Sequence, residues 1–223
     1  MEFNTLIDRK AETDRITDAL HRDDTQFIVI YGRRRIGKST LIKHIVNARK
    51  QAVYFLSDTS VEAVQRAAFS KSVAMVIDGF DKVVYPDWES LFRSMNNQLS
   101  ERIIVCIDEF PYLVKSCDVL PSVIQKLLNE KKLKFDLILC GSSQQLMHGY
   151  VLNRQSPLYG LANEIIKMRP IPARYIGEAM ECDAVQAVEE FAVWGGVPRY
   201  WELRRDYPDI ETAIRKVLLD PQG

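Results

Sequence analysis

The feature that most constrains the fold is a glycine-rich loop between an apolar run and a helical pattern. Residues 32–40 read Gly-Arg-Arg-Arg-Ile-Gly-Lys-Ser-Thr and match the phosphate-binding pattern G-x-x-x-x-G-K-[ST]. The apolar run Phe27–Tyr31 predicts a buried strand before the loop, and residues 38–49 predict a helix with one apolar side. In this order, the free amides at the helix N-terminus point toward a bound phosphate.

The loop residues are the predicted contacts to a nucleotide. The two glycines leave room for backbone amides to curl around phosphate oxygens. Lys38 is expected to reach the β- and γ-phosphates, and the Ser39 hydroxyl is expected to bind Mg²⁺. The full predicted nucleotide-binding set of the loop is Gly32, Arg33, Arg34, Arg35, Ile36, Gly37, Lys38, Ser39 and Thr40.

Two apolar runs end in an aspartate, and each is a candidate for the strand that carries the metal ligand. In residues 102–110, Asp108 follows the apolar run and Glu109 follows directly, so one carboxylate can hold Mg²⁺ through water while the other takes a proton from the attacking water. In residues 73–81, Gly79 follows Asp78 and no second carboxylate is adjacent. We therefore predict Asp108 as metal ligand and Glu109 as base, and residues 73–81 as a buried helix or a short extra strand.

The remaining patterns predict a parallel five-stranded sheet flanked by helices. Strands are expected at residues 52–56, 135–143 and 165–168, and helices at residues 60–69, 87–99 and 119–129. Because carboxyl ends of parallel strands meet at one edge, Ser142 or Ser143 is a predicted phosphate sensor. The alternative role for either serine is the N-cap of a helix over residues 144–148.

The two ends of the chain predict helices rather than strands. Residues 3–22 predict a helix that either covers a sheet edge or closes over the nucleotide base. Beyond Pro172, helices are expected at residues 175–180, 184–194 and 209–219. The predicted domains are a nucleotide-binding α/β core at residues 1–172 and a small helical lid at residues 173–223, and the chain is expected to end before any further domain.

Composition narrows the partners and the compartment. The 30 basic and 30 acidic residues give zero net charge, so no global field attracts nucleic acid or a membrane. The longest apolar runs are far shorter than the ~20 residues of a membrane span. The 4 cysteines lack C-x-x-C spacing and the 3 histidines are scattered, which argues against a transition-metal site. We expect a cytoplasmic protein whose partners are a nucleotide and either a further protein or a second copy of the chain.

Five motifs in order resemble the archaeal-type ATPase family, P-loop proteins of the AAA+/STAND kind: residues 32–39, 108–113, 139–143, 156–160 and 195–200. Asp8-Arg9 with Glu12 resembles that family's N-terminal signature, which adds Asp8 and Arg9 to the predicted nucleotide contacts. The resemblance implies ATP or ADP as the nucleotide, and a sensor strand between the loop strand and the metal-binding strand. It also implies that longer relatives carry a winged helix and a nuclease-like domain after the lid.

One departure from the family pattern concerns hydrolysis. The family usually has an arginine directly after Pro-Leu-Tyr-Gly, and this chain has Leu161. Such an arginine stabilises charge in the transition state, so its absence predicts slow turnover. Arg154, Arg169 and Arg199 are the alternatives, and Arg199 is favoured because helical lids of this class often contribute such a residue.

The predicted function is Mg-dependent ATP binding and hydrolysis coupled to movement of the lid or a partner domain. The alternative is a nucleotide-dependent binding switch with little or no turnover. The predicted catalytic set is Lys38, Glu109, Ser142, Ser143 and Arg199, and the predicted metal set is Ser39 and Asp108.

Overall fold

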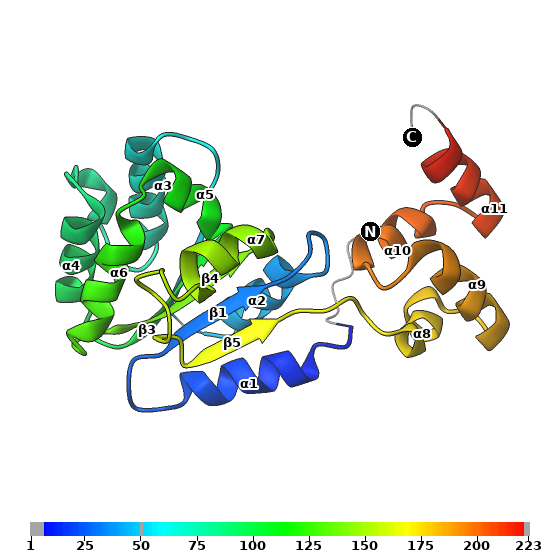
Figure 1. Ribbon diagram of the computed structural model, residues 1–223, viewed down its shortest axis with the longest axis horizontal. Coiled ribbons are helices and arrows are strands. Elements are labelled where there is room, and N and C mark those ends of the chain that lie inside the picture. The colour runs from blue at the N-terminus through cyan, green and yellow to red at the C-terminus, as the bar shows by residue number, and fades with distance from the viewer. Residues whose placement is uncertain (1–6, 50, 221–223) are drawn as a thin grey trace.

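The computed structural model describes residues 7–49 and 51–220 and shows a parallel sheet between two helical layers, followed by a separate group of helices (Figure 1). The predicted features at residues 1–6, 50 and 221–223 lie outside the described residues. The strands are β1 (Phe27–Tyr31), β2 (Ala52–Leu56), β3 (Ile103–Asp108), β4 (Phe135–Gly141) and β5 (Glu164–Lys167). The helices are α1 (Lys10–Leu20), α2 (Lys38–Asn47), α3 (Glu62–Ala74), α4 (Trp88–Gln98), α5 (Phe110–Ser116), α6 (Leu120–Asn129), α7 (Gln144–Met147), α8 (Ile176–Met180), α9 (Ala184–Trp194), α10 (Pro198–Arg205) and α11 (Ile210–Ala213).

The strand order is β2-β3-β4-β1-β5, and every neighbouring pair is parallel. β4 pairs with both β1 and β3, with Phe27 beside Leu137 and Ile103 beside Phe135, so it lies between them, as the family resemblance implies. Strands β3 and β4 are buried throughout, which is why they read as continuous apolar runs. Their common direction brings the carboxyl ends of β1, β3 and β4 to one edge, and that edge carries the candidate site.

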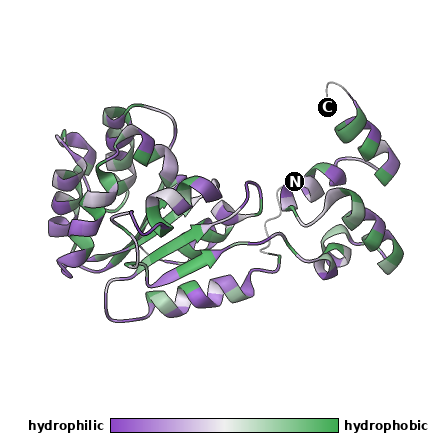
Figure 2. Ribbon diagram, in the orientation of Figure 1, coloured by the Kyte–Doolittle hydropathy of each residue, from purple (hydrophilic) through white to green (hydrophobic). Residues whose placement is uncertain are grey.

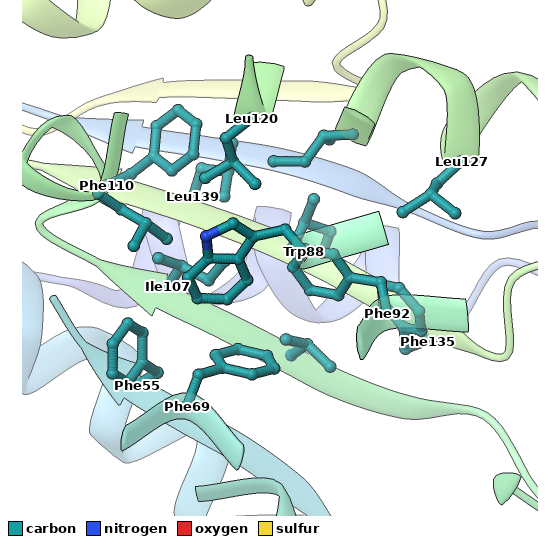
Figure 3. Packing of buried hydrophobic residues seen from close by; sticks show 14 of the residues in the cluster. Phe55, Phe69, Trp88, Phe92, Ile107, Phe110, Leu120, Leu127, Phe135 and Leu139 are labelled. Carbon is teal, nitrogen blue, oxygen red and sulfur yellow. The ribbon is translucent and has the colours of Figure 1, made fainter. Parts of the chain in front are cut away.

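One face of the sheet packs against α3 to α7. Alternate strand residues such as Val29 and Leu139 point into this layer, where they meet a cluster of large aromatic side chains (Figure 3). Phe69 is fully buried, and its ring meets Trp88 and Phe92 edge-on with centroids 5.6 and 5.4 Å away. These rings bury a large apolar area in preferred geometry, so this layer is the principal core of the fold.

The opposite face packs against α1 and α2. Helix α1 buries Ile16, Ala19 and Leu20 in this second cluster, and Figure 1 shows it beside the edge strand β5. Arg15 also forms an ion pair with Glu164 of β5. The interpretation of this helix as a cover for the sheet is therefore confirmed. In Figure 2 the strands are strongly hydrophobic while the outer turns of the helices are hydrophilic, as this layering requires.

Residues 73–81 contain no strand. Helix α3 runs to Ala74, and the turn that follows carries Asp78, which is exposed. Residues 80–82 then form a 3-10 helix. The apolar residues Phe69 and Val73 lie one helical turn apart and share the buried side of α3, so the run continues a helix. The alternative of a short extra strand at residues 73–81 is therefore wrong. The helix alternative is correct for residues 73 and 74, which end α3.

Helices α8 to α11 form a C-terminal helical unit beside the sheet (Figure 1). Its own apolar cluster includes Ile176, Trp194 and Trp201, separate from the two clusters of the sheet. The Ile171 amide donates to the Gly196 carbonyl at 2.7 Å, which ties the turn before α10 to the segment that leaves β5. A Cβ at Gly196 would lie 2.0 Å from the Ile171 carbonyl oxygen, so this close approach requires glycine. Across residues 7–49 and 51–220, no helix combines the length and the apolar character needed to cross a membrane.

Candidate functional site

The loop after β1 follows a course that depends on its glycines. A Cβ at Gly32 would lie 2.5 Å from the Met168 carbonyl oxygen, so the loop can pass β5 only with glycine there. Gly37 has φ +90° and forms the left-handed start of α2, while Arg35 at φ +66° makes a left-handed bend two residues earlier. The loop therefore leads directly to the N-terminus of α2, whose free amides make an anion-binding end.

Lys38 is buried at the first position of α2. Its Nζ donates to the carbonyls of Gly32 at 3.1 Å and Arg33 at 2.8 Å. Burial lowers the pKa of Lys38 from its ordinary value, and nearby anionic groups that include Glu109 and Asp108 act in the opposite direction. The loop carbonyls thus orient the ammonium group at the entrance to α2.

Three groups meet at the Asp108 carboxylate, which is fully buried at the end of β3. Ser39 Oγ and Tyr54 Oη both donate to Oδ2, at 2.6 and 2.8 Å, and the Glu109 amide donates to Oδ1 at 2.9 Å. Burial and the neighbouring carboxylate raise the pKa of Tyr54, so its phenol remains a donor. The structure brings both predicted metal ligands into direct contact.

The donor set of this group fits Mg²⁺. It offers hard oxygen atoms from one hydroxyl and one carboxylate, Ser39 and Asp108. Within the described residues, no group of three or more His, Cys, Asp or Glu could hold a metal ion. Mg²⁺ keeps several waters and is held by one or two protein oxygens together with substrate phosphates, so two protein ligands suffice.

Glu109 lies beside the end of β4. Its backbone is left-handed, at φ +53°, and its carboxylate Oε2 accepts from Ser142 Oγ at 3.0 Å and from the Ser142 amide at 3.2 Å. The Ser57 hydroxyl donates to the carbonyl of Glu109 at 2.6 Å and to that of Asp108 at 2.9 Å. These contacts fix the chain where β3 ends and orient the carboxylate of Glu109 toward the end of β4.

The two serines after β4 have different positions. Ser142 contacts Glu109 and lines the cleft described below, whereas Ser143 is the N-cap of α7 and accepts from the Leu146 amide at 3.4 Å. The N-cap alternative is therefore confirmed for Ser143. The geometry leaves Ser142 as the one of the pair that faces the predicted base.

A cleft of about 870 Å³ opens at this edge of the sheet, within the range of small-molecule sites. Its walls come from the loop, from α2, from the ends of β3 and β4, and from α10. The lining residues are Arg34, Arg35, Gly37, Lys38, Ser39, Thr40, Lys43, His44, Asn47, Glu109, Tyr112, Ser142, Pro198, Arg199 and Glu202.

Several predicted site residues lie outside this lining. Arg33 is exposed, and Ile36 is buried in the second core cluster. Arg9 is 4% exposed and donates to the carbonyls of Ile36 and Arg169, both at 2.9 Å, so it braces the loop from behind. Asp8 lies 3.9 Å from the Arg174 guanidinium. A nucleotide contact by Asp8 or Arg9 stays a prediction.

Of the positions considered for a catalytic arginine, the favoured Arg199 and the family position 161 differ in placement. Arg199 lines the cleft on α10 and forms an ion pair with Glu202 at 3.0 Å. Leu161 packs against the principal core and is not part of the cleft lining.

Sequence reasoning gave no role to Tyr54, Ser57 and Tyr112. Tyr54 stood inside an apolar strand pattern, where its hydroxyl gave no sign of its partner. Tyr112 was visible in the extension Asp-Glu-Phe-Pro-Tyr after β3, but its function was not apparent. In the structure its hydroxyl accepts from Arg34 Nη2 at 2.5 Å.

A parallel sheet whose first strand leads through a glycine-rich loop into a helix, with an acidic strand end beside that helix, defines the P-loop ATPase class of fold. The chain belongs to the family of ATPase domains found predominantly in Archaea, whose model matches residues 6–181, more than half of the chain. The resemblance seen in the sequence motifs is thereby confirmed. A Methanocaldococcus jannaschii relative named "Uncharacterized protein MJECL04" is 34% identical over 200 residues, covering 88% of this chain and 43% of the relative.

Solved structures share the fold at low sequence identity. Aeropyrum pernix ORC1, solved in complex with DNA, has a TM-score of 0.62 and 15% identity, covering 91% of this chain and 59% of that one. Aeropyrum pernix ORC2, solved as ADPNP-ADP complexes, has a TM-score of 0.61 and 14% identity, with 92% and 64% covered. The Thermotoga maritima RuvB Holliday junction branch migration motor has a TM-score of 0.54 and 16% identity, again with 92% and 64% covered. The chain thus spans less than half of its curated relative and less than two thirds of each of these chains.

Proposed function

We propose that this chain binds Mg-ATP and hydrolyses it slowly, with the C-terminal helical unit acting as a lid. The observation that carries the proposal is the chain of contacts at the carboxyl edge of the sheet. Ser39 contacts Asp108, the neighbouring Glu109 contacts Ser142, and Lys38 is buried beside them at the start of α2. Lys38, Ser39, Glu109 and Ser142 line one cleft, and Asp108 is buried directly behind Ser39.

The proposed reaction is attack of water on the γ-phosphorus of ATP. A bond forms between the water oxygen and that phosphorus, the bond to the β,γ-bridging oxygen breaks, and ADP and inorganic phosphate leave. Glu109 takes the proton from the water, Lys38 and the loop amides bind the phosphates, and Ser142 contacts the γ-phosphate. Mg²⁺ held by Ser39 and Asp108 neutralises phosphate charge when it is bound.

One feature supports the lid and another supports slow turnover. Pro198, Arg199 and Glu202 of α10 line the same cleft as α2, so a nucleotide there would touch both the sheet and the helical unit. Leu161 offers no donor at the position where the family usually has arginine. The second candidate function, a nucleotide-dependent binding switch with little turnover, draws on the same two features.

A turnover assay with the purified chain and Mg-ATP, with and without nucleic acid, tests the proposal and separates the enzyme from the switch. We expect measurable phosphate release that Glu109→Gln abolishes while ATP binding remains, because an amide cannot accept the proton. Lys38→Ala should weaken ATP binding by the loss of a charge-assisted contact, about 1.5–3 kcal/mol.

Asp78→Asn is the matched control for Asp108→Asn. Asp78 is exposed on the turn after α3, so its variant should keep Mg-dependent ATP binding, whereas Asp108→Asn should lose it. Equal calorimetric affinity for ATP in Lys38→Ala and the parent would refute the site. Parent turnover indistinguishable from Glu109→Gln, with ATP still bound, would favour the switch. Lid coupling predicts slower hydrogen exchange in α10 with ATP than with ADP.

A further inference from the structure

An arginine of the glycine-rich loop contacts the sensor serine. Arg34 Nε donates to Ser142 Oγ at 3.3 Å, and the same hydroxyl donates to Glu109 Oε2 at 3.0 Å. The guanidinium, the sensor hydroxyl and the base therefore form one continuous hydrogen-bonded row across the cleft. The row joins residues 108 positions apart in the chain, Arg34 and Ser142, at the place proposed for the γ-phosphate.

The guanidinium of Arg34 has a second partner that fixes its direction. Its Nη2 donates to Tyr112 Oη at 2.5 Å, and Tyr112 comes from the first turn of α5, directly after Glu109. Tyr112 thus holds Arg34 from α5, the helix whose N-cap is Glu109. Two partners, Ser142 after β4 and Tyr112 on α5, hold the planar group more firmly than one would.

The three consecutive arginines of the loop differ in their placement relative to the cleft. Arg33 is exposed and lies outside the cleft lining, while Arg34 and Arg35 both line it. Of the three, Arg34 is the one whose side chain reaches Ser142.

We infer that Arg34 is the arginine that stabilises the transition state of the proposed hydrolysis, supplied by the loop itself and positioned by Tyr112. As the water attacks and the bridging bond breaks, negative charge spreads over the equatorial oxygens and the leaving ADP oxygen. A guanidinium beside Ser142 and Glu109 can donate to those oxygens with two parallel N–H groups. This inference rests on the proposed function and assigns one further residue to it.

On this assignment the loop supplies the arginine, so leucine at position 161 no longer argues for slow turnover. Leu161 is partly buried against the principal core and does not line the cleft, and Arg199 is paired with Glu202 on α10. Arg34 differs from both because its guanidinium already touches the sensor side chain.

The test compares single-turnover ATP hydrolysis, ATP affinity, and affinity for ADP with aluminium fluoride and Mg²⁺, a mimic of the transition state. For Arg34→Ala we expect the hydrolysis rate to fall on the order of 10³-fold. Affinity for the mimic should fall on the order of 10²–10³-fold, while ATP affinity changes little, because the contact strengthens only as charge develops. Tyr112→Phe should lower the rate and the mimic affinity by a smaller factor.

Arg22→Ala is the matched control, since Arg22 is exposed and pairs with Glu164 away from the cleft. It should behave as the parent in all three measurements. Arg34→Ala that keeps the parent's rate and mimic affinity overturns the inference, as does an equal loss of ATP and mimic affinity. A larger loss of mimic affinity in Arg199→Ala also overturns it. If the parent fails to bind ATP, the proposed function fails instead. If the parent binds ATP without turnover, the mimic affinities of Arg34→Ala and the parent decide the inference.

Discussion

Removing the phenolic hydroxyl of Tyr54 tests the buried group around Asp108. Tyr54 Oη and Ser39 Oγ donate to the same carboxylate oxygen, at 2.8 and 2.6 Å, and Asp108 has no exposed surface. Tyr54→Phe leaves the ring in place and deletes one of these two donors. The buried carboxylate then loses part of the hydrogen bonding that offsets its desolvation.

The expected loss follows from the type of hydrogen bond. A hydrogen bond to a charged group contributes roughly 1.5–3 kcal/mol, and Tyr54 is only partly buried, so we expect Tyr54→Phe to cost about 1–2 kcal/mol. For a chain of this size that corresponds to a fall in melting temperature of about 2–8 °C. Calorimetry on the nucleotide-free chain measures it, with Tyr207→Phe as the control from the C-terminal helical unit.

A double-mutant cycle isolates the contact from other effects of the substitution. In the Asp108→Asn background the carboxylate is already absent, so Tyr54→Phe should cost about 1 kcal/mol less than in the parent. The same melting temperature for Tyr54→Phe and the parent, or an equal loss in both backgrounds, would show that the phenol does not stabilise Asp108.

Three further predictions concern stability. Phe69→Ala should lower the free energy of unfolding by about 3–5 kcal/mol in urea, because it empties the centre of the aromatic cluster; a loss under 1 kcal/mol would contradict that packing. Gly196→Ala should speed hydrogen exchange in α8 to α11 and leave the sheet unchanged, since the new Cβ meets the Ile171 carbonyl, and unaltered exchange would refute this close approach. Burial raises the pKa of Asp136 in the folded chain. The folded chain therefore loses stability relative to the unfolded chain as the pH rises through that pKa. Denaturation midpoints of Asp136→Asn should therefore gain on the parent as the pH rises above about 4, and a difference that stays constant with pH would count against this prediction.

The sheet was largely predictable from the sequence because its central strands are buried on both faces. The continuous apolar runs at β1, β3 and β4 leave few alternatives, and the glycine-rich loop fixes the order strand, loop, helix. The choice of Asp108 over Asp78 rested on chemistry, namely the adjacent carboxylate, and the fold agrees with it. Short helices without a long apolar stripe, α5 and α10, went unpredicted.

The contacts inside the site could not be predicted, because they join distant positions. Tyr54 and Asp108 are 54 residues apart, and Arg34 and Ser142 are 108 residues apart. The local spacing of apolar residues indicates which face of an element is buried. It does not indicate which polar side chains from different strands meet at the edge of the sheet. The sequence therefore left Ser142 and Ser143 as alternatives, and strand register with the α7 cap was needed to separate them.

The strand order has a consequence for how the chain is synthesised. Among the residues that the structure describes, β1 pairs with β4 and β5, and about 110 residues separate it from β4. At ribosomal rates of roughly 5–20 residues per second, the strand waits on the order of 5–20 s for its first partner. During that interval the unpaired backbone N–H and C=O groups of this apolar strand are open to pairing with other chains. The strand that bears the phosphate loop is thus the first to be made, and it gains its second neighbour only when β5 has emerged.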